Sequence, residues 1–323
     1  MIRVSGFCVF FTSALYSLIF SFVLPLDGFK DRGNYLIYAE KASEFIARYL
    51  DQGVVSFLTN EPIFLSVNYF LSLFFSPELT LQLLIFLFSF IFAFAVLSYD
   101  KKLFLWLLLL LLLPQVLKNN VMQLRQGYAV AMFTLAWLCL HGKPRIFLIA
   151  LTPLMHSSFF VVLFFLLIYK TAHWIKLNFG LRAFFVGLAA LVASIALLYL
   201  ASVVGARQGV RYADADLNVS GLAFLFWFVV FSLFLLQPKS WFTKHGFPVV
   251  TLLVYLVMYF TFPLSARVFE STLPLVLIAG FSMQGWKLYS FKFLFLFYFC
   301  YQYYLGLQQP FLGFAGSNYT GFW

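Results

Sequence analysis

The chain has 323 residues, of which 63% are hydrophobic and only 10% charged, and its mean hydropathy is +0.96. A water-soluble protein of this length could not bury so much apolar surface, whereas a lipid bilayer accepts it. Long continuous apolar runs, such as residues 103–113 and 184–204, exclude a transmembrane β-barrel, whose strands alternate in polarity. We therefore expect an all-α, polytopic integral membrane protein.

The net charge of +10 does not indicate a nucleic-acid-binding protein. The basic residues are scattered in ones and twos between apolar runs, which is typical of the cytoplasmic loops of membrane proteins. Cys8, Cys139 and Cys300 lie within apolar runs, and no CxxC or Cys/His spacing is present. We therefore expect neither a disulfide framework nor a metal site, and no cofactor.

Hydropathy predicts a single domain, residues 1–323, with about ten or eleven transmembrane or re-entrant helices. The first run has no small-x-small cleavage site after it and is interpreted as a retained signal anchor. Several runs are short for a crossing of about 20 residues, which indicates broken or re-entrant segments. The predicted helices are roughly 4–24, 62–76, 79–98, 103–117, 121–140, 146–169, 183–204, 221–236, 247–262, 273–286 and 291–307.

The segment between the first two spans, residues 25–61, is the longest polar stretch and carries more acids than bases. Within it, small and apolar residues recur at helical spacing over 35–50. This pattern predicts an amphipathic helix that lies on the membrane surface. The acidic balance places the segment on the outer side.

The remaining loops are of two kinds. Short basic loops near Lys101, Lys143, Lys170, Lys239 and Lys287 are predicted to be cytoplasmic, and the chemically mixed loops 118–126, 205–221 and 263–272 are predicted to face outside. This sidedness leaves one crossing too many among 62–76, 79–98 and 103–117, so we expect one of these segments to be re-entrant.

Arg125 lies in a polar island, residues 119–127, between two long apolar runs. An arginine at such a position needs an anionic or carbonyl partner and marks a candidate functional site. The alternative is an ordinary helix-end arginine that extends its side chain to the lipid headgroups.

His156 interrupts the apolar run 146–169 just after Pro153. Proline disrupts a helix and frees a backbone carbonyl, so a pair of half-helices is expected here. An imidazole at that depth can bind a phosphate or accept a proton. The alternative is a structural histidine that bonds to a carbonyl or to Ser157.

Arg267, together with Arg125, Arg207 and Arg211, is a candidate for a convergent cationic pocket on one face. Guanidinium groups suit phosphate, and a lipid-linked diphosphate is the corresponding ligand at a membrane. The alternative for the loop 205–220 is a salt bridge of Arg211 with Asp214 or Asp216.

Asp27 and Asp31 follow the first span directly. A carboxylate there can act as general base toward an acceptor hydroxyl, and we take Asp31 as a catalytic candidate. The alternative is that both are merely solvated acids of a surface loop.

The order of these motifs resembles that of the EpsG-like, Wzy-type polysaccharide polymerases. The segment Leu124–Ala129 is similar to their IRQ-x-x-A signature, and residues 150–158 are similar to A-x-x-x-H-x-S-A, with Ser158 in place of alanine. Upstream, Asp31 with Tyr35 and Tyr38 resembles an acid followed by Y-x-x-Y, and Glu61-Pro62 matches the E-P pair that opens the next span, with Ile63 where glycine is usual. Arg267 matches an arginine in a short outer loop.

The resemblance implies an enzyme of the bacterial inner membrane whose active site faces the periplasm. It would polymerise undecaprenyl-pyrophosphate-linked oligosaccharide repeat units of O-antigen, capsule or exopolysaccharide. Arg125, Gln126 and Arg267 would bind the diphosphate and sugars, and Arg211 and Arg207 join them as candidates from the cationic pocket described above. Membrane lipids and a chain-length regulator protein are the other candidate partners.

Two alternatives stay open. One is a glycosyltransferase that uses a polyprenyl-phosphate sugar donor. The other is a lipid-linked-oligosaccharide flippase or other transporter, for which charged residues along a cavity reaching both faces are expected.

Overall fold

The computed structural model describes residues 4–26, 28–203 and 221–316, with the side chains of 197–203 outside that description. Within these ranges the chain is helical, apart from loops and one isolated β-bridge between Phe29 and Ala315. The predicted all-α class is confirmed. The chain divides into two compact units, residues 1–157 with 296–323 and residues 158–295. The prediction of a single membrane domain stays a prediction, and the units are described separately.

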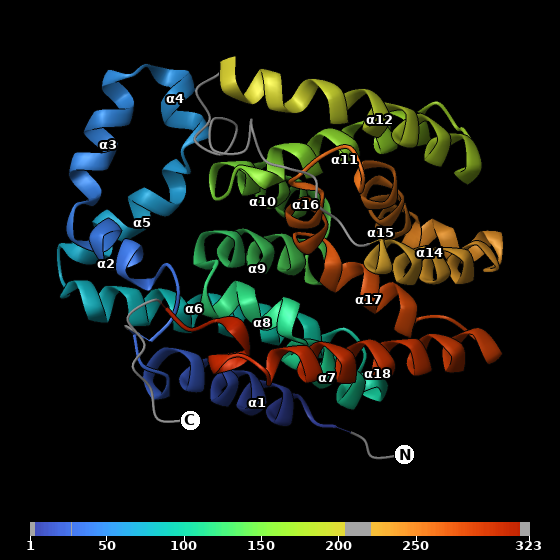
Figure 1. Cartoon of the computed structure of the whole chain (residues 1–323), viewed down its shortest axis with the longest axis horizontal. Coiled ribbons are helices and arrows are strands. Elements are labelled where there is room, and N and C mark those ends of the chain that lie inside the picture. Colours follow the sequence, from blue (N-terminus) through green and yellow to red (C-terminus); the bar gives the residue numbers. More distant parts are fainter. Residues whose placement is uncertain (1–3, 27, 204–220, 317–323) are drawn as a thin grey trace. The chain divides into compact units, whose positions relative to one another are not determined.

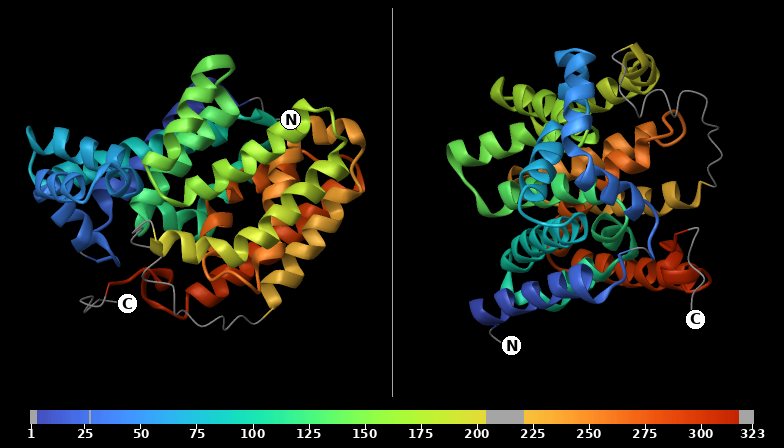
Figure 2. Two further views of the ribbon diagram at one scale, coloured as in Figure 1. Left: turned by 90° about the horizontal axis from the view of Figure 1, so that it is seen from above. Right: turned by 90° about the vertical axis from the view of Figure 1, so that its left-hand side faces the viewer.

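The first unit is built around one long apolar helix, α6, which packs against α1, α2 and α9 (Figure 1). Four short helices, α2 to α5, form a group that Figure 2 shows in blue to cyan in both views. The helices of this unit are α1 (Gly6–Leu18), extended by the π-helical turn Ile19–Val23, α2 (Arg32–Glu40), α3 (Ala42–Asp51), α4 (Val54–Thr59), α5 (Pro62–Ser72), α6 (Pro77–Ser98), the 3₁₀ turn Lys101–Leu103, α7 (Phe104–Leu112), α8 (Pro114–Val121), α9 (Leu124–Cys139), α10 (Gly142–Leu151), the 3₁₀ turns η3 (Thr152–Leu154) and Pro310–Gly313, and the C-terminal part of α18 (Trp286–Gly306).

The second unit is organised around α15, which contacts α11, α12, α14, α16 and α17. Gly246 on α15 lies where an added Cβ would meet the Tyr169 hydroxyl at 2.2 Å, so helix α11 approaches α15 closely there. The helices of this unit are α11 (Ser158–Trp174), α12 (Phe179–Val203), α14 (Leu222–Leu235), α15 (Lys239–Met258), α16 (Ser265–Glu270), α17 (Leu273–Phe281) and the N-terminal part of α18.

Among the residues that the structure describes, four helices are long and apolar enough to cross a membrane: residues 6–23, 77–98, 179–196 and 239–258. The 22 residues of α6 rise about 33 Å at 1.5 Å per residue, which matches the hydrocarbon thickness. Large apolar side chains on these helices face outward, including Phe7 at 77% exposed and Ile195 at 78%. Such surfaces suit lipid rather than water.

The predicted span 103–117 is broken. Lys101–Leu112 and Pro114–Val121 are bent by 64° at Leu113, so they form either one broken span or a re-entrant loop. Pro114 explains the bend, because proline disfavours helical geometry in the residue before it. The prediction that one segment in this region is re-entrant is consistent with this bend.

The predicted amphipathic helix over 35–50 is wrong in its continuity. The chain breaks at Lys41 into α2 and α3. On the face expected to be apolar, Ala39 and Ala42 are enclosed by the protein and Leu50 is exposed. Tyr35 and Tyr38 on α2 are buried instead, because their rings pack against Phe64 of α5.

A buried polar network fixes α8 against α1 and α6. Asn120 donates to the Tyr16 hydroxyl at 3.0 Å, Tyr16 donates to the Leu111 carbonyl at 3.2 Å, and Ser89 donates to the Asn120 side-chain oxygen at 3.3 Å. Satisfied polar groups of this kind specify one arrangement of the helices around them. The network therefore sets where α9, which follows α8, begins.

Candidate functional site

The centre of the site is Glu61, which sits at the N-terminal end of α5. Its backbone is in the left-handed conformation (φ 64°, ψ 50°), and Pro62 occupies the first turn of the helix. A non-glycine residue in this conformation costs about 1 kcal/mol or more, so the surrounding structure must hold it there. The result is a carboxylate that is turned into the protein, with its side chain only 7% exposed.

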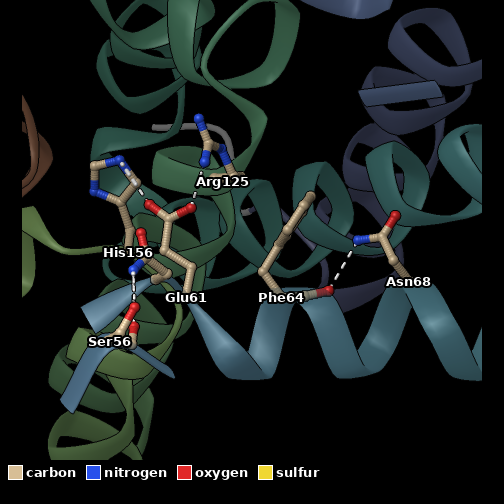
Figure 3. A network of polar contacts seen from close by, with 7 residues as sticks. Ser56, Glu61, Phe64, Asn68, Arg125 and His156 are labelled. Carbon is tan, nitrogen blue, oxygen red and sulfur yellow. Dashed lines mark hydrogen bonds and ion pairs between the residues drawn. The ribbon is translucent and has the colours of Figure 1, made fainter. Parts of the chain in front are cut away.

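Arg125 and His156 both contact this carboxylate (Figure 3). Arg125 Nη1 donates to Glu61 Oε2 at 2.6 Å, and His156 Nε2 lies 3.6 Å from Glu61 Oε1. The His156 side chain is 5% exposed and that of Arg125 is 25% exposed. The start of α5, helix α9 and the link between η3 and α11, which are far apart in sequence, therefore meet at one carboxylate.

Two tyrosines of α2 form an aromatic wall over Arg125. The guanidinium carbon lies 5.8 Å from the Tyr35 ring centre and 5.2 Å from that of Tyr38. A guanidinium over an aromatic face is stabilised by the ring quadrupole. Burial raises the pKa of the Tyr35 hydroxyl, and the nearby Arg125 acts in the opposite direction. Tyr35 is therefore a neutral hydrogen-bonding group at physiological pH.

His156 is positioned by the break that Pro153 introduces. The 3₁₀ turn η3 ends at Leu154, the His156 amide donates to the Thr152 carbonyl at 3.1 Å, and α11 starts only at Ser158. The turn η3 contacts α4, α5 and α9, the helices around Glu61 and Arg125. The predicted interruption of the run 146–169 is thus observed, and it delivers the imidazole to the site.

None of the other predicted site residues contacts the Glu61 carboxylate in the part of the chain that the structure describes. Gln126 is buried beside Arg125 on α9, whereas Asp31 is exposed at the start of α2, where Asn34 donates to it at 3.3 Å. Arg267 is half-buried on α16 in the second unit, so the structure does not test its convergence with Arg125. The remaining predicted residues, Asp27, Arg207 and Arg211, lie outside the described residues.

Glu61 is a site residue that the sequence did not predict. It was one of several acids in the outer segment, and only its place in the Glu61-Pro62 pair, directly before an apolar run, set it apart. Arg32, which is fully buried at the start of α2, was not predicted either. No pattern of the sequence separates Arg32 from the exposed basic residues nearby, because its burial depends on tertiary packing.

The chemistry of the cluster is that of acid–base and anion recognition. A carboxylate next to an imidazole can accept a proton and pass it on, and a guanidinium with a free edge can bind an anion. Arg125 Nε is buried and finds no hydrogen-bond partner among the described residues. In the described ranges, no three His, Cys, Asp or Glu side chains are grouped to hold a metal ion.

Comparison of the chain with protein-family models, with curated proteins and with solved structures returns no match.

Proposed function

We propose that this protein is a membrane glycosyltransferase that polymerises undecaprenyl-pyrophosphate-linked oligosaccharide repeat units on the outer face of the bacterial inner membrane. The observation that carries the proposal is the Glu61 carboxylate held between Arg125 and His156. In a chain this apolar, buried ionisable residues that contact one another mark a functional site. The resemblance to Wzy-type polymerases supports the assignment, because the segment Leu124–Ala129 supplies Arg125 to this cluster and residues 150–158 supply His156.

The reaction requires one bond to form and one to break. A hydroxyl of the acceptor sugar attacks the anomeric carbon of the donor chain, the bond from that carbon to the diphosphate oxygen breaks, and undecaprenyl diphosphate leaves. The hydroxyl proton passes to a base of the protein. Because the leaving group is already activated, catalysis consists chiefly of alignment and stabilisation of charge.

The cluster supplies groups for each of these tasks. Glu61 is the candidate base, with His156 as the second proton acceptor or as the group that orients the hydroxyl. Arg125 uses one nitrogen on Glu61 and also hydrogen-bonds with the Tyr35 side chain, and the exposed quarter of its side chain is the part that can meet the diphosphate. Glu61 thereby takes the role that Asp31 was expected to have, because Glu61 is buried in the cluster and Asp31 is exposed.

The membrane setting of the proposal rests on the apolar helices. Besides the four candidate spans and the bent pair, Pro62–Ser72, Ser158–Trp174 and Leu222–Leu235 are shorter apolar helices. Ten or eleven transmembrane or re-entrant segments follow if these and the other short helices also enter the bilayer. The basic loops then face the cytoplasm, and the site faces outside.

A strain that lacks this gene tests the function. We expect the polymer ladder to be lost while single-repeat material still reaches the surface, and wild-type protein to restore the ladder. Glu61→Gln should not restore it, whereas Glu44→Gln, which removes an exposed acid of α3, should. Loss of both the ladder and the single-repeat material would instead indicate the flippase.

A further inference from the structure

Arg32, the first residue of α2, combines complete burial with an unused hydrogen-bonding edge. Its exposed fraction is 0%, and its Nε donates to the Val121 carbonyl at 2.7 Å. The two terminal nitrogens, Nη1 and Nη2, find no hydrogen-bond partner among the described residues. The Phe29 ring lies 5.5 Å from the guanidinium carbon and offers only a cation–π contact.

This arginine is charged at physiological pH. Burial lowers its pKa to about 10, which is still far above neutrality. Unpaired charged donors inside a protein are strongly unfavourable, and they persist where an anion compensates them. The terminal nitrogens of a guanidinium form a planar pair that matches two oxygens of a phosphate.

The position of Arg32 connects it to the Glu61 site. Its partner Val121 precedes Arg125 by four residues, at the end of α8. On α2, Arg32 shares the buried face with Tyr35, whose ring lies over the Arg125 guanidinium. Arg32 therefore lies on the helix that supplies the aromatic wall, and it bonds to the end of α8, the helix that directly precedes the one carrying Arg125.

The residues just before Arg32 are covered by the C-terminal segment. The Lys30 amide donates to the Phe314 carbonyl at 2.9 Å, the Gly316 amide donates to the Gly28 carbonyl at 2.9 Å, and the rings of Phe29 and Phe311 lie 5.1 Å apart. The Lys30 ammonium also donates to the Gly313 carbonyl at 3.1 Å, so a ligand can reach the guanidinium only when this cover moves. Displacement of Phe29 would uncover the guanidinium.

We propose that Arg32 is a second phosphate-binding residue of the site, which takes a phosphate of the lipid diphosphate with its Nη1 and Nη2. This inference rests on the proposed function and adds a residue to it. Arg125 and Arg32 then share the two phosphates of the leaving group, one guanidinium being anchored by Glu61 and the other by Val121.

Binding measurements on the purified full-length protein test this assignment separately from polymerisation. The probes are inorganic pyrophosphate and undecaprenyl diphosphate, with the protein in phosphatidylcholine nanodiscs. For Arg32→Met, which keeps the volume without the charge, we expect affinity for both probes to fall about tenfold or more, the loss of one charge-assisted pair. The matched control is Arg48→Met, because Arg48 is exposed and also stacks on an aromatic ring, that of Phe45.

A second readout distinguishes a binding arginine from a structural one. Without ligand, Arg32→Met should melt no lower than wild type, because it removes an unpaired buried charge. A melting temperature well below wild type together with unchanged affinity would overturn the proposal. If Arg32→Met does not fold, Arg32→Lys serves instead: it keeps the charge but loses the fork, so weaker binding is expected and equal binding overturns the proposal.

Two further comparisons distinguish a lipid headgroup from a diphosphate as the ligand, and failure of this inference from failure of the proposed function. Arg32-dependent stabilisation by phosphatidylglycerol nanodiscs, with none from either diphosphate, would mean that a lipid headgroup occupies the site and would overturn the assignment. Arg32-dependent diphosphate binding by a protein that makes no polymer would refute the proposed function and leave this inference standing. Normal polymerisation and normal diphosphate affinity in Arg32→Met would refute this inference and leave the proposed function standing.

Discussion

Glu61 and Arg125 are 64 residues apart in the chain, and their carboxylate and guanidinium meet at 2.6 Å. The same carboxylate lies 3.6 Å from the His156 imidazole. Because Glu61 neutralises Arg125, this arginine is a paired and oriented cation and not a lone charge that awaits a ligand. The anion-binding role expected of Arg125 therefore depends on the part of the guanidinium that Glu61 leaves unused.

Stability measurements should show that this pair is coupled. Glu61→Gln leaves a buried cation unpaired, and we expect a destabilisation near the low end of about 3–5 kcal/mol, since a quarter of the Arg125 side chain is exposed. Adding Arg125→Gln should then cost much less than it does alone, in a double-mutant cycle of denaturant unfolding in detergent. The exposed Glu44 and Arg48 of α3 supply a control cycle, for which a coupling of about 0.5 kcal/mol or less is expected. Equal couplings in the two cycles would contradict a structured ion pair.

Substitution of Arg125 by lysine separates charge from geometry. Lysine keeps the positive charge but cannot hold Glu61 with one nitrogen and present a planar edge to a diphosphate. We expect Arg125→Lys to be folded and membrane-inserted at normal level, with polymer formation reduced about tenfold or more. Wild-type polymer length and amount from this variant would show that a point charge is sufficient.

Two substitutions of His156 distinguish the roles that an imidazole can have. His156→Gln keeps a hydrogen-bonding group near Glu61 but cannot titrate near neutral pH, whereas His156→Phe keeps much of the volume without polar function. Loss of activity in both variants is expected if His156 carries the proton. Activity in the glutamine variant alone assigns it a positioning role, and full activity in the phenylalanine variant would reduce it to packing.

Substitution of Gly127 tests whether the close approach of α8 and α9 is needed to place Arg125. A Cβ added at this position would lie 2.2 Å from the Asn119 carbonyl oxygen, which is backbone and cannot rotate away. Gly127→Ala should therefore force the two helices apart, destabilise the fold by about 1–3 kcal/mol and lower activity. Gly33→Ala on α2 is the matched control, because nothing lies within 4 Å of its added Cβ, and it should behave like wild type.

The sidedness of the site can be measured with single cysteines. In a variant without Cys8, Cys139 and Cys300, we expect Lys239→Cys to resist an impermeant thiol reagent in intact cells and to react after permeabilisation. An exposed residue of the outer segment, such as Glu44→Cys, should react in intact cells. The opposite labelling pattern would place the site on the cytoplasmic side.

Much of the architecture was accessible from the sequence, because it depends on composition and local breaks. The apolar runs predicted the helical class, and Pro153 predicted the interruption that carries His156. The centre of the site was not accessible in this way. The burial of Glu61 depends on a left-handed residue at a helix start and on a partner 64 residues away, and no local pattern encodes either.

The same limit explains the segment after the first span. Helical periodicity over 35–50 favoured one surface helix, but the chain breaks at Lys41, and the tyrosines of α2 are buried against α5. Aromatic residues can occupy either a protein interior or a membrane interface, so periodicity alone could not decide between them. The tertiary contacts with Phe64 decide it.

The most direct test of the proposed function is a reaction with the purified protein in nanodiscs. Lipid-linked single-repeat material extracted from the strain that lacks this gene provides the substrate, so the sugar structure need not be known in advance. We predict that wild-type protein joins these units into products of two or more repeats and releases one undecaprenyl diphosphate for each new linkage. Glu61→Gln should bind the substrate but form no linkage. Failure of the wild-type protein to lengthen the substrate, or equal lengthening by Glu61→Gln, would contradict the account.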